Sequence, residues 1–244
     1  MTSPLQYLPY CGFAPEPAGL LVHWNLDPWL LAVLAGAAIV AVRVTTGRER
    51  VLAFAAIGVA ILLFVSPLCA LTSALFAARS AHHLLLTTLL AGLIAFVLPV
   101  RWPRLISLPW WTGLSAVTMW LWHAPPLYTA ALSSDLVYWL MQASLLATAI
   151  GFWRAVRFAT PAGAVIALLT YMVQMGLLGA LLSFGSTAFY TPHALTTLAW
   201  GMTQLQDQQL GGLIMWVPGA ASYLLVALIR LREMLAEDRE PAPA

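Results

Sequence analysis

Long apolar runs recur along the whole chain and restrict the architectures open to it. There are seven, near residues 28–44, 51–67, 82–99, 108–124, 136–153, 162–184 and 208–229. At 1.5 Å per helical residue, each run approaches or exceeds the ~30 Å hydrocarbon core of a membrane. With 61% hydrophobic and only 8% charged residues, the chain does not match the composition of a soluble domain.

Helices are the expected form of these runs, because backbone amides in lipid must bond within their own segment and no run shows the alternation of a barrel strand. The sequence therefore predicts an all-α polytopic membrane protein. We expect a single seven-helix transmembrane domain over residues 1–229, followed by a short charged tail over 230–244.

Arginines predict the orientation. The chain has no lysine, and ten of its eleven arginines fall in alternate connections: Arg43, Arg48 and Arg50; Arg101 and Arg104; Arg154 and Arg157; Arg230, Arg232 and Arg239. Basic residues stay on the cytoplasmic side, so the N-terminus is expected outside and the C-terminus in the cytoplasm. The segment before the first run has no basic residue and is interpreted as translocated mature sequence rather than a leader. Because the arginines are scattered over short connections, no nucleic-acid partner is expected.

All five histidines map to the opposite, outer side: His23, His82, His83, His123 and His193. Adjacent His82 and His83 are about 100° apart on a helix, so we expect at most one of them to point inward. His123 stands just before Pro125 and Pro126, which end its helix. For His23 and His193 we expect ordinary roles at the membrane interface.

Imidazole and thioether together are a ligand set suited to Cu(I). We predict a copper site from His83 and His123 with Met119, completed by His82 or Met215. Arg79, the one arginine on the outer side, shares a helix face with His83 and would repel a metal unless Asp207 or Asp135 neutralises it.

The start of the last run is the most informative stretch. Asp207, Gly211 and Met215 recur every four residues on one face, and Gly211 allows close approach of another helix. Asp207 and Gln208 are predicted to orient an imidazole or balance charge around the metal. Asp207 could instead cap its own helix.

Several blocks resemble the CtaG-type assembly factors of caa3-type cytochrome c oxidases. They are Asp207 to Trp216 within 205–219, Trp122 to Tyr128, Ser66 to Leu68, His83 to Leu86 and Leu178 to Leu182. The resemblance implies a seven-helix membrane protein that helps to mature a haem-copper oxidase, with copper delivery as the expected chemistry. The resemblance implies cytochrome c oxidase subunits, the lipid bilayer and a copper chaperone as partners, in the bacterial inner membrane.

The chain departs from that family pattern at several positions. Arg79 stands where a further histidine is often found, and His82 stands in place of a glutamine. A His-x-x-Glu-His element is replaced at Tyr138, Met141 and Gln142. The resemblance therefore supports oxidase assembly more strongly than any one set of ligands.

Two cysteines, Cys11 and Cys69, both map to the outer side, where oxidation is allowed. Packing is the first interpretation, a disulfide the second and copper ligation the third. No Cys-x-x-Cys spacing, Walker motif or linked nucleophile and base is present, so no enzyme activity is expected.

Three other functions stay open at this stage. One is a b-type haem protein with His83 and His123 as axial ligands. The others are a copper permease and a metal-free scaffold for oxidase subunits.

Overall fold

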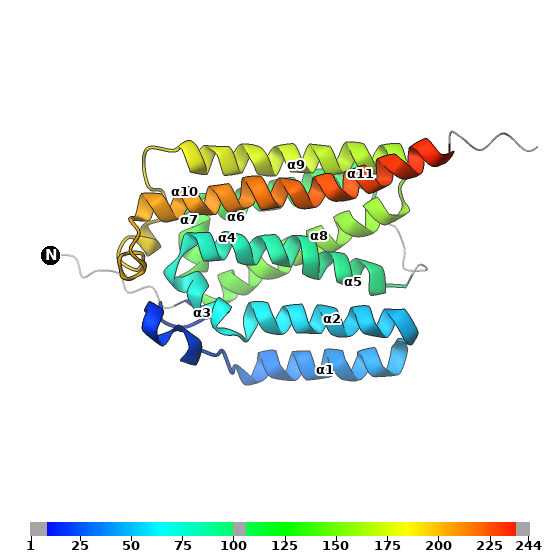
Figure 1. The fold of residues 1–244 in the computed structure, drawn as a ribbon. Coiled ribbons are helices and arrows are strands. Elements are labelled where there is room, and N and C mark those ends of the chain that lie inside the picture. The colour runs from blue at the N-terminus through cyan, green and yellow to red at the C-terminus, as the bar shows by residue number, and fades with distance from the viewer. Residues whose placement is uncertain (1–8, 100–105, 238–244) are drawn as a thin grey trace, which may run out of the picture.

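The computed structural model describes residues 9–99 and 106–237, which are helical and contain no β-strand (Figure 1). The long helices are α1 (Pro28–Val44), α2 (Gly47–Phe64), α6 (Leu108–His123), α8 (Asp135–Phe158) and α9 (Pro161–Phe184). Two further helices contain π-helical turns: α4 (Phe76–Leu85), η2 (Leu86–Leu90) and α5 (Ala91–Val97) form one, and α10 (Gln204–Ile214), η5 (Met215–Gly219) and α11 (Ala220–Glu237) form the other. Short helices α3 (Pro67–Ala74), α7 (Pro125–Ala131), η1 (Pro17–Val22), η3 (Thr191–His193) and η4 (Leu198–Trp200) connect them. The all-α prediction is confirmed.

The long helices lie side by side, so their connections gather at two ends of one bundle (Figure 1). The end that carries the loop 185–203, the N-terminal segment and α7 is called the histidine end. The opposite end, with the α1–α2 and α8–α9 connections, is called the arginine end. Arg79, in the first turn of α4, lies near the histidine end. The other arginines of the described residues lie at the arginine end, in or beside the α1–α2 connection and at the ends of α8 and α11.

Arginines at the arginine end bind helix C-terminal carbonyls, which carry partial negative charge. Arg157 donates to the carbonyls of Ala95 and Phe96, and Arg230 donates to that of Ala159. These contacts join α8 to α5 and α11 to the C-terminal end of α8.

Four described helices are long and apolar enough to span a membrane: Phe76–Val97, Asp135–Phe158, Pro161–Phe184 and Gln204–Ala236. A fifth arises if α2 and α3, bent by 43°, count as one span, and α1 is a shorter apolar helix. At 17 and 16 residues, α1 and α6 cover roughly 24–26 Å.

Two helices begin before the apolar runs that predicted them, because polar residues belong to their first turns. The third span was expected from residue 82, but its helix begins at Phe76 and includes Arg79. The last helix begins at Gln204, four residues before the predicted start, because Thr203 and Gln206 form a capping box there.

The largest core cluster lies between α8, α9 and α11, where aromatic rings stack. The Trp153 and Tyr223 rings are 5.3 Å apart, and the Phe152 and Tyr171 rings are 5.2 Å apart. The Trp153 indole donates to the Thr87 carbonyl in η2, which ties this core to α4.

Candidate functional site

The helix is interrupted at the histidine end, where α3 ends at Ala74 and α4 begins at Phe76. At a helix break, backbone groups lose their partners and need replacements. The Ala74 carbonyl accepts hydrogen bonds from Thr196 and His193, and the carboxylate of Asp207 accepts from the Phe76 and Ala77 amides at 2.7 and 3.0 Å. The loop 185–203 and α10 therefore anchor the start of α4.

Asp207 consequently plays neither role expected for it. It caps α4 rather than its own helix, which Thr203 caps. It forms no ion pair with Arg79: in residues 9–99 and 106–237 the only salt bridge joins Arg230 to Glu233. Asp135 is exposed at the start of α8 and lies outside the buried polar residues.

The side chain of Gln208 likewise forms hydrogen bonds with backbone groups and not with a histidine. Its carboxamide oxygen accepts from the Phe189 amide at 2.7 Å, and its nitrogen donates to the Thr187 carbonyl at 3.1 Å. Gln208 therefore holds the loop that follows α9.

His82 and His83 are both buried, at 0% and 5% exposure, so the expectation that only one would point inward was wrong. The reason is that α4 is central and has packed neighbours on opposite faces. His82 lies against Phe64, with ring centroids 5.2 Å apart, whereas His83 faces His123 at 5.8 Å.

A small cavity lies between His83 and His123. Its volume is about 20 Å³, enough for one water-sized sphere or a single ion. Three methionines line it with the two imidazoles: Met119, Met175 and Met215. Ser80, Leu84, Thr87, Leu145 and Tyr171 complete the wall. Four of the predicted ligands, His83, His123, Met119 and Met215, are thus brought together.

The two imidazoles differ in how they are held. His123 Nδ1 lies 2.7 Å from the Met119 carbonyl, which orients the ring and leaves Nε2 as the other nitrogen. Neither ring nitrogen of His83 has a hydrogen-bond partner among the described residues. A buried imidazole without a partner is costly, so this one is available to a ligand.

Only neutral side chains approach the cavity. Among the described residues, no three of His, Cys, Asp and Glu are grouped as a metal site would require. Any metal ion in this cavity would need thioether sulfur among its ligands. Thioethers prefer soft ions, so Cu(I) is the metal ion that the lining favours.

Met175 is the cavity residue that sequence reasoning left out of the ligand set. It lies on α9, far in sequence from both histidines. Its side chain is 4% exposed and is fixed against Gly219, where a Cβ would lie 2.6 Å from the methionine Cε. Its position among the outer and mid-membrane methionines was the only sequence signal.

Both π-helical turns lie beside the cavity. Thr87 belongs to η2 and Met215 opens η5, which also contains Pro218. Such bulges inside α-helices occur frequently at functional sites. Here each bulge contributes one residue to the cavity wall.

Small residues let α10 approach its neighbours closely. A Cβ on Gly211 would lie 2.5 Å from a Phe76 ring carbon, and one on Gly212 would lie 2.6 Å from the Gly179 carbonyl oxygen. The repeat of Asp207, Gly211 and Met215 therefore faces α4, and the expected close approach at Gly211 is confirmed.

A family model described as cytochrome c oxidase caa3 assembly factor (Caa3_CtaG) matches residues 31–237, which cover most of the chain. The chain belongs to this family. No curated protein and no solved structure matches it.

The positions where this caa3 assembly factor departs from the expected family pattern lie close together. The Arg79 guanidinium lies 5.4 Å from the Tyr138 ring centroid and donates to the Thr72 carbonyl. Among the described residues, the carboxamide of Gln142 has no hydrogen-bond partner. The same holds for both ring nitrogens of His82. Arg79 thus contacts α3 and α8 and does not line the cavity.

His193 and His23 have structural contacts. The His193 Nε2 is 2.6 Å from the Tyr128 hydroxyl, and its Nδ1 is 3.2 Å from the Ala74 carbonyl. Burial, and then the charge of Arg79, lower the pKa of His193 to about 3. His23 is exposed and bonds the Gly19 carbonyl. His193, for which an ordinary role at the membrane interface was expected, is fully buried within the protein.

Cys11 and Cys69 form a disulfide, so packing of free thiols was the wrong first choice. Their bond fastens the N-terminal segment to α3 at the histidine end. Both sulfurs are then committed and cannot serve as thiolate ligands.

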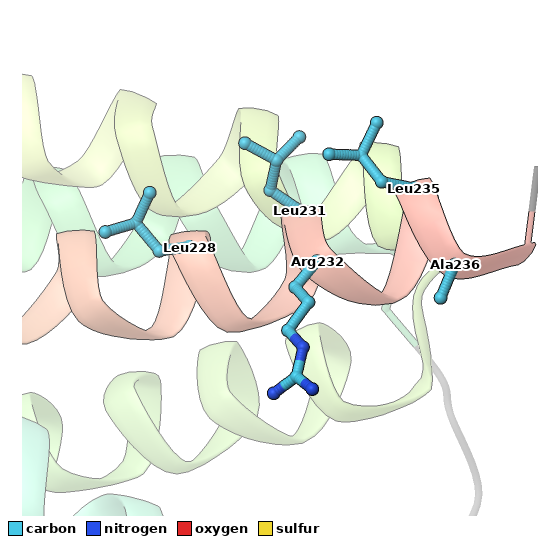
Figure 2. Close-up of a pocket in the computed structure, with 5 residues that line it drawn as sticks. All are labelled: Leu228, Leu231, Arg232, Leu235 and Ala236. Atoms are coloured by element: carbon cyan, nitrogen blue, oxygen red, sulfur yellow. The ribbon is translucent and has the colours of Figure 1, made fainter.

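The arginine end has a hollow of its own on α11, of about 500 Å³ (Figure 2). Leu228, Leu231 and Leu235 line it with Arg232, whose side chain points away from them. Leucines beside one arginine are typical of a helix end near lipid headgroups, so no chemistry is assigned here.

Proposed function

We propose that this caa3 assembly factor binds Cu(I) as cargo at the cavity between His83 and His123 and passes it to a haem-copper oxidase at the extracytoplasmic face of the bacterial inner membrane. In this proposal the chain has seven spans, with the N-terminus outside. The alternation of arginines and the separation of the two ends support that orientation.

The observation that carries the proposal is that one small cavity brings together thioethers and an imidazole that has no hydrogen-bond partner among the described residues. His83 supplies free nitrogens, His123 is oriented by the Met119 carbonyl, and Met119, Met175 and Met215 supply sulfur. A bound Cu(I) would accept electron density from neutral ligands and would need no carboxylate beside it.

A haem is a poorer fit for the same histidines. Pockets for molecules of that size are about 300–1,000 Å³. The cavity is about 20 Å³, which has no room for a macrocycle. An absorption spectrum without a Soret band would agree with this exclusion.

A copper permease would need polar or thioether groups that continue to the arginine end. On that side of the cavity, Tyr171 packs with Phe152 and Tyr223, and Tyr223 stacks on Trp153. This buried aromatic layer favours exchange of copper at the histidine end alone.

Copper stoichiometry and affinity in purified protein test the proposal. Cu(I) is added without oxygen and titrated against a competing chelator. We expect one ion per chain, and at least a tenfold weaker affinity in His83→Ala and in His123→Ala, because each removes a nitrogen ligand.

His23→Ala is the matched control, since this histidine is exposed at the same end and lies outside the cavity. Met175→Leu should also weaken binding, whereas Met172→Leu, next to the core but outside the cavity wall, should not. Metal-free protein after reconstitution, or equal affinity in all variants, would leave a metal-free scaffold as the function.

A further inference from the structure

A lateral groove between α6 and α9 lies away from the histidine cavity. Its volume is about 970 Å³, and its α6 wall runs from Leu108 to Leu121, roughly 20 Å at the rise of a helix. Small residues form much of the lining: Thr112, Gly113, Ala116, Gly163, Ala167 and Thr170. This spacing of small side chains is typical of surfaces where another transmembrane helix packs closely.

One polar side chain also lines the groove. Gln174 lies near the middle of α9, which is itself a candidate span. The carboxamide of Gln174 has no hydrogen-bond partner in the part of the chain that the structure describes. An amide facing hydrocarbon without a partner is costly, and glutamine is among the residues that bond across helices in membranes.

We infer that this groove receives one transmembrane helix of a membrane-embedded oxidase subunit, whose own hydroxyl or amide side chain bonds Gln174. The inference rests on the role in oxidase assembly and is independent of copper. Lipid chains could fill the groove but offer no group to bond the carboxamide. A second copy of this chain in the groove is an outcome that the crosslinking below distinguishes.

Crosslinking from within the groove tests the partner. Gly113 is the position of choice because a Cβ there would meet nothing within 4 Å, so a photoreactive residue enters without disturbing the fold. Gly58 on α2 has the same open surroundings and is the control. The full chain is irradiated in membranes of cells that assemble the oxidase, and adducts are identified with antibodies against the oxidase subunits.

We expect an adduct with an oxidase subunit from position 113 and none from position 58. Adducts with lipid only, with a second copy only, or with the same subunit at equal yield from both positions would overturn the inference.

Two substitutions test the contacts themselves. Gly113→Leu fills the groove and Gln174→Leu removes its polar group, so each should lower several-fold the amount of oxidase subunit that purifies with the chain. Gly58→Leu should leave it unchanged. Unchanged co-purification in both groove variants, at normal thermal stability, would contradict the inference.

Copper affinity separates this result from the proposed function. Both groove variants should bind Cu(I) as the native chain does, because neither residue lines the histidine cavity. Loss of crosslinks with copper binding intact would overturn only the groove. Crosslinks without copper binding would retain the groove and remove the copper proposal.

Discussion

Asp207 shows how a single buried carboxylate can hold two segments together. Its oxygens accept from amides at the start of α4, more than a hundred residues earlier in the chain. Amide donors at a helix N-terminus stabilise a negative charge, so the carboxylate needs no arginine beside it.

Replacing Asp207 should therefore destabilise the fold without a direct loss of ligands. We expect Asp207→Ala to lower the free energy of unfolding by about 1–3 kcal/mol, because two buried donors lose their acceptor. Asp207→Asn, which keeps one acceptor oxygen, should lie between Ala and the native residue. Thermal unfolding in detergent measures the order.

Asp135→Ala is the control for this series, since that carboxylate is exposed in the first turn of α8. It should cost no more than about 0.5 kcal/mol. Equal losses at both positions would contradict the capping role of Asp207.

His193 should make stability depend on pH. The pKa of His193 is lowered to about 3 in the folded chain, against about 6.5 when unfolded. Below pH ~6.5 the unfolded chain takes up a proton at His193 that the folded chain does not. The contribution of His193 to the free energy of unfolding is therefore at its maximum above that pH and decreases as the pH falls toward 3. Melting temperatures between about pH 7.5 and 5 should fall less steeply in His193→Gln than in the native chain.

The exposed His23 provides the comparison for the pH series. His23→Gln should retain the native slope, because its ring is exposed and bonds only the nearby Gly19 carbonyl. An unchanged slope in His193→Gln would show that other groups cause the pH dependence.

At the scale of helices, the packing of α10 against α9 depends on backbone contact. Gly212 and Gly179 approach so closely that a Cβ on either would lie under 3 Å from the carbonyl oxygen of the other. Backbone atoms cannot move aside as a flexible side chain can, so the two helices would have to separate.

Replacing glycine with alanine should therefore change the stability of the fold in opposite directions in α10 and in α2. Gly212→Ala is expected to destabilise by about 1–3 kcal/mol through overpacking. Gly58→Ala, with open space around it, should be neutral or stabilising by up to about 1 kcal/mol, the helix preference of alanine over glycine. Similar melting temperatures for the two variants would argue against the close contact.

At the scale of the whole molecule, the disulfide and all the described arginines except Arg79 belong to opposite ends of the bundle. Cys11 and Cys69 are separated by 58 residues, and their bond closes the N-terminal segment and the first two helices into one loop. Disulfides persist in oxidising compartments, so the bond supports the proposed extracytoplasmic placement of the histidine end.

We expect both cysteines to be oxidised in membranes and to react with a maleimide mass tag only after reduction. Cys11→Ser and Cys69→Ser should lower the unfolding free energy equally, by about 2–4 kcal/mol, because each opens the same loop. A tag that reacts before reduction would contradict the bond and the outward orientation together.

Much of the architecture could be predicted from local pattern. Apolar runs predicted helices along the chain, and the boundary at His123 was confirmed because Pro125 and Pro126 end a helix wherever they stand. The face shared by Asp207, Gly211 and Met215 was also correct, since helical periodicity depends on nothing outside the helix. The start of α4 was missed because its amides are capped by a residue from α10.

Hydrophobicity, charge and helical period are local properties, and they were enough to predict the helical class, the separation of arginine from histidine along the chain, and four of the residues around the cavity. Three outcomes emerged only from the packing of the helices: His82 and His83 face opposite neighbours, Met175 joins the cavity, and Asp207 binds amides instead of Arg79. Those outcomes depend on which helices pack on each side of α4. Packing of that kind is set by contacts between residues far apart in the chain, which no local pattern records.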